Sequence, residues 1–153
     1  MQPNFDFRPA TADDIPPLLE LYEHLSSDNV PCPPDIARDN LERLTRISGS
    51  AVLIGLRGGQ IVTSCTLIVI PNLTRGGLPF AVIENVVTHP DHRRQGYGKA
   101  ILDAASDRAW AEGCYKVMLS TGSKRPATLQ FYEGAGFEQS RTGFQKRRVP
   151  PRG

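Results

Sequence analysis

The sequence predicts one α+β domain, in which helices pack on a mixed β-sheet, and three observations lead to that fold class. The 153 residues fit one compact domain and leave no room for a second of full size. Apolar residues at helical spacing alternate along the chain with segments rich in β-branched residues. Three strand-like segments follow one another in the middle of the chain. The predicted order of elements is β-α-α-β-β-β-α-β-α-β.

Strands are predicted where apolar residues alternate or where β-branched residues gather. Two of these segments flank a turn at residues 57–60 that contains a Gly-Gly pair, which predicts an antiparallel hairpin. A loop with two prolines and a second Gly-Gly pair follows at residues 71–79. The predicted strands are residues 5–8, 51–56, 61–70, 80–88, 115–120 and a terminal strand region over 137–149.

Helices are predicted where apolar residues recur three and four positions apart. Asp14 is the expected N-cap of the first helix, which places Pro16 and Pro17 in the first turn, where backbone N–H groups have no partner within the helix. The third helix is the best defined, and Gly113 suits the left-handed position that ends it. The predicted helices begin near Asp14 and run to about residue 25, then cover 36–47, 98–113 and 128–135.

Composition and charge exclude several classes of protein. Eighteen Lys and Arg against 16 Asp and Glu leave a formal charge of +2, too small to predict a nucleic-acid or membrane partner. The apolar runs fall far short of the ~20 residues that a membrane-spanning helix needs. Residues 1–4 lack a secretory pattern, so we expect a cytoplasmic protein. The basic residues after about 146 are expected to form a solvated tail of the single domain 1–153.

Cysteine and histidine spacing gives no sign of a disulfide framework or a metal site. The three cysteines, Cys32, Cys65 and Cys114, are widely separated and are expected to be small buried hydrophobes. His89 and His92 have H-x-x-H spacing in a predicted loop, without supporting cysteine or carboxylate ligands. We therefore expect no bound metal, with both histidines on a surface loop and His24 in the first helix.

The segment that carries chemistry is residues 83–99, where a strand passes through a turn into the N-terminus of a helix. The first turn of a helix presents free N–H groups and a positive dipole end, and glycines such as Gly96 and Gly98 let a ligand approach the backbone. Arg93, Arg94 and Lys99 add charge, so the segment suits a phosphate or pyrophosphate. The G-x-x-x-x-G-K-[ST] loop and the third glycine of the dinucleotide fingerprint are both missing. The alternative is a structural turn.

Neighbouring motifs resemble a known family. The run Arg93 to Gly98 resembles the R/Q-x-x-G-x-G/A acetyl-CoA signature of the GNAT superfamily of N-acetyltransferases, and residues 131–137 resemble its F-Y-E-x-x-G-F element. Residues 83–87 and 113–117 resemble the I-E-D-V-V and G-C-Y-K-V stretches of glucosamine-6-phosphate N-acetyltransferases. The resemblance covers about residues 82 to 138 and is closest to the glucosamine-6-phosphate branch.

The resemblance implies a fold and a cofactor site. The implied fold is a mixed, mostly antiparallel sheet that splays between its fourth and fifth strands, flanked by about four helices. Residues 86–88 would pair with the pantetheine of acetyl-CoA, and one of their amides would polarise the thioester carbonyl. The implied cofactor-binding residues are Val86, Val87, Thr88, Arg93, Arg94, Gln95, Gly96, Tyr97, Gly98, Lys99, Phe131 and Tyr132.

Two residues are candidates for catalysis, Tyr132 because it matches the family's recurrent tyrosine and Glu84 because it lies on the strand beside the predicted cleft. Tyr132 would be the general acid at the CoA sulfur, and the alternative is a core aromatic. Glu84 would accept the amine proton, anchor the substrate ammonium beside Asn85, or serve as a structural hydrogen-bonding group. Cys114 is expected in the core, which favours direct transfer over an acyl-cysteine route. The family asparagine before Tyr132 is absent, so Lys124 or Arg125 would meet a CoA phosphate instead.

The leading interpretation is an N-acetyltransferase that moves acetyl from acetyl-CoA to a primary amine of a small molecule. An amino sugar is placed slightly ahead of an amino acid, a polyamine or a peptide N-terminus. The alternative from another class is a non-catalytic acyl-CoA-binding regulatory module. A nucleic-acid-binding protein that uses Arg93, Arg94 and residues 146–148 is the weakest alternative, and we expect neither a nucleic-acid nor a membrane partner. The family resemblance implies a homodimer.

Overall fold

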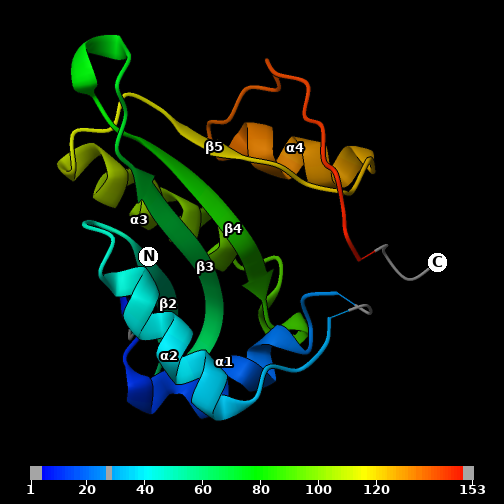
Figure 1. The fold of residues 1–153 in the computed structure, drawn as a ribbon. Coiled ribbons are helices and arrows are strands. Elements are labelled where there is room, and N and C mark those ends of the chain that lie inside the picture. Colours follow the sequence, from blue (N-terminus) through cyan, green and yellow to red (C-terminus); the bar gives the residue numbers. More distant parts are fainter. Residues whose placement is uncertain (1–4, 27–28, 150–153) are drawn as a thin grey trace.

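A five-stranded sheet separates two layers of helices in the computed structural model, which describes residues 5–26 and 29–149 (Figure 1). The strands are β1 (Phe5–Pro9), β2 (Ala51–Arg57), β3 (Gln60–Ile70), β4 (Phe80–Thr88) and β5 (Val117–Leu119). The helices are α1 (Ile15–Tyr22), α2 (Pro34–Thr45), α3 (Tyr97–Ala111) and α4 (Pro126–Gly134). The predicted α+β class is confirmed. The expectations for residues 1–4 and for the last four residues of the tail lie outside the described residues.

The sheet is mixed and its strands lie in sequence order. The first four strands pair antiparallel with their neighbours, and β4 pairs with β5 in parallel. The predicted hairpin is confirmed between β2 and β3. Its turn residues Gly58 and Gly59 have φ angles of 55° and 81°, left-handed values that glycine adopts at little cost.

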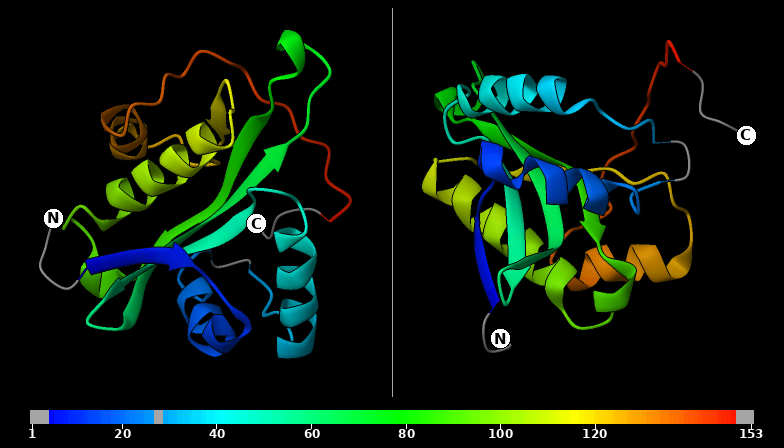
Figure 2. Two further views of the ribbon diagram at one scale, coloured as in Figure 1. Left: turned by 90° about the vertical axis from the view of Figure 1, so that its left-hand side faces the viewer. Right: turned by 90° about the horizontal axis from the view of Figure 1, so that it is seen from below.

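Helices α1 and α2 lie on one face of the sheet, and α3 and α4 lie on the other (Figure 2). Alternate residues of the central strands therefore enter two different cores. On the α3 face, Leu67 and Ile83 pack with Ile101 and Leu102 of the helix, and all four are almost fully buried. No helix among the described residues is long and apolar enough to cross a bilayer.

The strand region predicted over residues 137–149 is wrong. After α4 the described chain has no strand, and residues 138–149 are exposed. This segment runs from the α4 side past the sheet to the side of α1 and α2 (Figure 2). Its polar residues leave only Phe144 and Val149 as large apolar side chains, and both are exposed, so the segment has too little apolar surface to hold a strand on this protein.

Two smaller expectations are also corrected. Cys32 is only half-buried, in the loop before α2, whereas Cys65 and Cys114 are buried as predicted. His24 lies beyond the end of α1, because that helix stops at Tyr22 and the chain continues as a turn. The position after α1 brings the ring of His24 to 4.7 Å from that of His89, the residue that follows β4.

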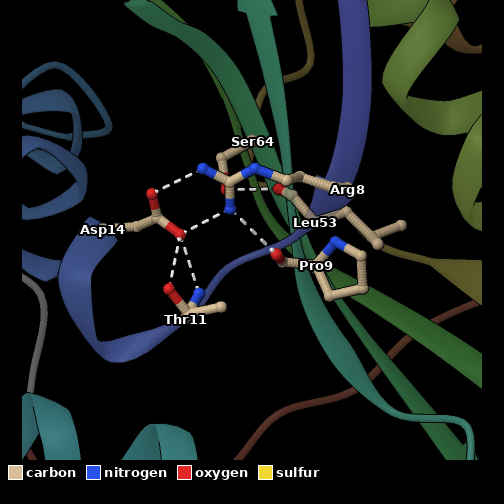
Figure 3. A network of polar contacts seen from close by, with 6 residues as sticks. All are labelled: Arg8, Pro9, Thr11, Asp14, Leu53 and Ser64. Carbon is tan, nitrogen blue, oxygen red and sulfur yellow. Dashed lines mark hydrogen bonds and ion pairs between the residues drawn. The ribbon is translucent and has the colours of Figure 1, made fainter. Parts of the chain in front are cut away.

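The start of α1 is fixed by an ion pair to β1 (Figure 3). Arg8 donates from Nη1 and Nη2 to the two carboxylate oxygens of Asp14 over 2.7 and 2.9 Å, and the Thr11 amide donates to the same carboxylate over 2.7 Å. Asp14 is the N-cap of α1 as predicted, but its side chain makes no capping bond. The second and third helical residues are Pro16 and Pro17, which have no N–H to donate, so the carboxylate turns back to Arg8.

The Arg8 guanidinium is the main reason that the pKa of Asp14 falls to about 2. A carboxyl whose pKa is lower in the folded state stabilises the protein above its unfolded pKa of about 4, and this contribution is lost as the pH falls to about 2. Solvent reaches the side chain of Arg8, which is 45% exposed. The expected contribution is therefore about 1 to 2 kcal/mol.

Asp14→Asn is expected to lower the free energy of unfolding by about 1 to 2 kcal/mol at pH 7. The difference from wild type should shrink as the pH is lowered from about 4 to about 2, because Asp14 itself becomes protonated there. Urea denaturation across this pH range measures both effects. Asp13→Asn is the matched control, since Asp13 is exposed and this variant should keep the wild-type free energy of unfolding at pH 7; equal losses in both variants would contradict the assignment.

Candidate functional site

A bulge interrupts the pairing of β4 at its centre. Ser64 of β3 stands opposite Val87 and Thr66 stands opposite Glu84, so Asn85 and Val86 share Cys65 as their facing residue. Asn85 takes the left-handed conformation that such an extra residue needs, with a φ of 54°. The bulge changes the alternation of side chains along the strand.

The faces of β4 can be assigned from the two cores. Before the bulge, Ile83 belongs to the α3-side core, and Glu84 lies on the α1 side in one row with Thr66 and Val52. After the bulge, Val86 packs toward the α3 side and Val87 enters the α1-side core. The extra residue therefore keeps apolar side chains in both cores on either side of Asn85.

Strand β4 loses its second neighbour at the same point. Strand β5 pairs only with Ala81, Val82 and Ile83, and the two strands then diverge (Figure 1). From residue 84 to residue 88, β4 has no strand on that side among the described residues. Because the His89 amide donates to Val62 on β3, ladder alternation turns the Thr88 amide toward the open side. The splay implied by the family resemblance is thus present.

The loop after β4 leads directly into α3. Arg93 donates from Nε to the Thr88 carbonyl over 3.1 Å, and Arg57 of the hairpin donates to the Gln95 side chain over 3.3 Å. Gly96 is the N-cap of α3 with a φ of 85°. These contacts hold the loop against the end of the sheet and present the free amides of the first turn of α3 to solvent.

Gly98 marks a close approach between α3 and α4. A Cβ at this position would lie 3.0 Å from the ring of Phe131 and 3.4 Å from the Thr88 hydroxyl. That hydroxyl lies 3.0 Å from the hydroxyl of Thr63 on β3. Gly98 thus lets one aromatic residue of α4, the end of β4 and the first turn of α3 meet at the mouth of the splay.

The other side chains of the loop differ in exposure to solvent. Arg94 and Lys99 are exposed, and Lys99 forms an ion pair with Asp103 at 3.0 Å. The ring of Tyr97, in contrast, is buried against Phe5 at 4.5 Å between ring centroids. Its side chain is therefore part of the core. Tyr97 was predicted to bind the cofactor, and only its backbone is available for that role.

The two candidate catalytic residues lie on either side of the splay. Tyr132 on α4 packs against the α3-side core and contacts Phe131 and Phe137. Burial, with smaller contributions from Cys65 and Glu84, raises the pKa of its phenol, so the group stays protonated at neutral pH. Glu84 is exposed on the α1 side, next to Asn85.

Neither buried cysteine is activated. Burial raises the pKa of the Cys65 thiol to about 12, and it also raises the pKa of Cys114, with a smaller contribution from Glu112. A thiol in such surroundings carries almost no thiolate at neutral pH. This placement agrees with the core role predicted for Cys114.

The three histidines come together at the end of β4, which the sequence reasoning missed. His24 and His89 have ring centroids 4.7 Å apart, and His89 and His92 have centroids 5.8 Å apart. His89 accepts a hydrogen bond from the Asp91 amide at Nδ1. Within the residues described here, no group of three or more histidine, cysteine or acidic side chains is arranged to hold a metal ion.

Two further features were missed at the site. Tyr22, at the end of α1, places its phenol near the hydroxyls of Ser64 and Thr66, and burial raises its pKa. The only sequence signal for the bulge was an asparagine, Asn85, within a strand of β-branched residues. Asparagine tolerates a left-handed φ better than most residues. Lys124 and Arg125, expected near a CoA phosphate, are exposed just before and at the N-cap of α4.

Comparison with known proteins decides the family. The acetyltransferase (GNAT) family matches residues 18–137 of the chain. This chain belongs to the acetyltransferase (GNAT) family. It is accordingly an N-acetyltransferase that uses acetyl-CoA, as the motifs around Gly96 and Tyr132 predicted.

Individual relatives agree with the family and span the chain. A glucosamine 6-phosphate N-acetyltransferase of Trypanosoma brucei brucei is 33% identical over 138 residues, which cover 88% of this chain and 89% of the relative. An Agrobacterium tumefaciens protein with a provisional acetyltransferase description is 39% identical, with a TM-score of 0.87 over 94% of this chain and 99% of its own. A Bacillus halodurans protein described as a transcriptional regulator is 29% identical, with a TM-score of 0.78 over 94% and 99% of the two chains.

Gly96→Ala is expected to weaken the binding of CoA about tenfold or more, because a Cβ in the loop occupies space at the amides that face the phosphates. Gly113→Ala is the matched control: Gly113 has a φ of 83° against 85° for Gly96, and a Cβ would meet no atom within 4 Å at either position. Both variants should therefore lose about 1 to 2 kcal/mol of stability. Calorimetric titration with CoA separates them, and equal affinities would refute the loop assignment.

Proposed function

We propose that this acetyl-CoA-dependent N-acetyltransferase transfers acetyl directly to the primary amine of a small molecule, with an amino sugar as the leading acceptor. The observation that carries the proposal is the divergence of β4 and β5, which leaves the second half of β4 without a neighbour on the β5 side within the described chain. Such a split offers backbone amides to an extended thiol arm on one side and a carboxylate to an amine on the other.

The open side of β4 and the loop at residues 93–99 both suit acetyl-CoA. In the proposal Val86, Val87 and Thr88 pair with its pantetheine arm, and the free amides from residue 93 to residue 99 bind its pyrophosphate. The open left-handed Gly96 supports this fit, since it leaves space beside the loop amides. The close packing of Gly98 on Phe131 supports it by holding the start of α3 against α4. Tyr97 contributes through its amide only.

The chemistry needs three groups. The neutral amine attacks the thioester carbonyl carbon, a backbone amide of β4 stabilises the oxyanion, and the C–S bond then breaks to release the thiolate of CoA. Tyr132, kept protonated by its raised pKa, donates a proton to that thiolate. The amine loses its proton to Glu84, directly or through water, unless Glu84 only anchors the ammonium beside Asn85. An acyl-cysteine route is not proposed, because burial raises the pKa of Cys65 and Cys114.

An amino sugar is placed first among acceptors because the Trypanosoma brucei brucei relative is described as acting on glucosamine 6-phosphate. An amino acid, a polyamine and a peptide N-terminus are the other candidates. A non-catalytic acyl-CoA-binding regulator is the second candidate function, and it is favoured by the likeness to the protein described as a transcriptional regulator. The presence of Tyr132 and Glu84 at the split favours the enzyme.

We also propose a cytoplasmic homodimer. Residues 138–149 are exposed and unpaired, and the ring of Phe144 is 95% exposed, so a second copy could bury this segment. Three cysteines without a disulfide suit a reducing compartment. Sedimentation of the full chain tests the dimer, and cell fractionation tests the location; a monomer or a secreted protein would refute them.

The proposed function is tested by thiol release from acetyl-CoA with a panel of amines: glucosamine 6-phosphate, amino acids, polyamines and a peptide with a free N-terminus. Turnover on one class of amine is expected, with the amino sugar leading. CoA binding is measured by calorimetry on the same preparation. Tight binding with no turnover on any amine would favour the regulatory module, and the absence of binding would refute both functions.

Tyr132→Phe is expected to lower kcat about 100-fold or more, because the departing thiolate loses its proton donor while the ring remains in place. The Kd for CoA should stay within about twofold of wild type. In wild type, loss of activity from ionisation of Tyr132 should appear only above the ordinary tyrosine pKa of about 10, since burial raises it. An unchanged kcat under conditions where chemistry limits the rate would remove Tyr132 from the mechanism.

A further inference from the structure

One face of the sheet stays open along β4 and β5. On the α3 side, Leu67, Ala81 and Ile83 are almost fully buried, whereas Ile68 and Val82 on the other side are half-buried and Glu84 is exposed. Helices α1 and α2 pack mainly on β2 and β3 and leave this area uncovered. We call it the open strip, and strand register places in it Ile68, Ile70, Phe80, Val82, Glu84 and Met118.

Glu84 forms one end of the open strip, and two cations form the other. The Lys116 ammonium lies 5.5 Å from the centre of the Phe80 ring and 5.4 Å from that of Tyr115. The Arg75 guanidinium lies 5.6 Å from the Tyr115 ring. Because Val117 faces Ala81 on the α3 side, Lys116 falls on the side of the open strip.

The two cations have no counterion within the part of the chain that the structure describes. Neither Arg75 nor Lys116 is within ion-pair distance of a carboxylate there. The aromatic rings hold both charges in place through cation–π contacts, which cost a ligand less ordering than free side chains would. Two fixed, unpaired cations beside an apolar surface are suited to bind an anion.

Register also sets the distance between the two ends. From Phe80 to Glu84 there are four residues of unbroken strand before the bulge, and at about 3.3 Å for each residue they span about 13 Å. A ligand along the strip would therefore meet a carboxylate at one end, apolar side chains in the middle and cations at the other end.

We propose that the acceptor of this N-acetyltransferase lies along the open strip and carries a phosphate or carboxylate about 13 Å from its amine, bound by Arg75 and Lys116. The inference rests on the proposed function, since it places the amine at Glu84. It narrows the acceptor class: a polyamine brings a cation to Arg75 and Lys116 and is rejected. An acceptor too short to span the strip loses one of its two charged contacts, and glucosamine 6-phosphate is among these. The inference therefore ranks longer anionic amines above the amino sugar, which was placed first from the description of a relative. A peptide of four extended residues has a suitable length.

The test compares kcat/KM for ω-amino acids and ω-aminoalkyl phosphates of increasing length with that for uncharged amino alcohols of the same length. The expected result is an optimum near a span of about 13 Å, where the anionic acceptors exceed the neutral ones about tenfold. The carboxylate and phosphate series show which anion the site prefers. An absent optimum, or a diamine of that length used equally well, would overturn the proposal.

Variants connect the preference to the two cations. Arg75→Gln with Lys116→Gln should lower kcat/KM for the anionic acceptors to about that for the neutral ones, while Lys116→Arg should retain the preference. Arg43→Gln is the matched control, because Arg43 is exposed on α2 away from the strip and should change nothing. If the preference survives the double substitution, the anion is bound elsewhere and the proposal is overturned. If the double substitution makes a dimer dissociate, the two cations belong to a subunit interface and the proposal is also overturned.

The test separates this inference from the function on which it rests. If the wild-type enzyme turns over amines but shows no preference for anionic acceptors, the inference alone is overturned. No turnover on any amine, with CoA still bound, overturns the proposed function and the acceptor assignment together.

Discussion

Strand β4 has hydrogen-bonding neighbours on both sides at its start and on one side only at its end, and the site depends on this change. Backbone amides without a partner inside a protein are costly, so they persist only where water or a ligand satisfies them. The bulge at Asn85 sits where the pairing changes, and it keeps Val86 and Val87 in their separate cores. Strand β4 thus has free backbone groups on one edge while its apolar side chains remain packed in the two cores.

The surrounding elements hold that opening in place. Helix α3 begins where the loop from β4 ends, and Gly98 brings it close to Phe131 of α4. The neighbouring Tyr132 then lies beside the split, in contact with the α3-side core. Arg8 lies in the cross-strand row that leads through Ser64 to Val87. Its bond to Asp14 fixes α1 to β1, and Tyr22 at the end of that helix lies near Thr66.

Much of the fold could be predicted from local patterns. The β2–β3 hairpin, β4 and α3 follow from β-branched runs, glycine turns and helical spacing, because burial on one face imposes a period of two or about 3.6. The terminal strand over 137–149 could not be judged in this way. A strand forms only when a partner edge and an apolar surface receive it, and within the described structure residues 138–149 pair with no strand and bury no large apolar side chain.

The sequence by itself determined the family and the residues of its signature, since an anion-binding helix start needs glycines and free amides that are contiguous in the chain. Only the tertiary structure decided which side chains share a face. It buried Tyr97 against Phe5, gathered His24, His89 and His92, and aligned Glu84 with Lys116 across two strands. The physical reason is that strand register and the position of a bulge fix these distances, and both arise from pairing between residues far apart in the chain.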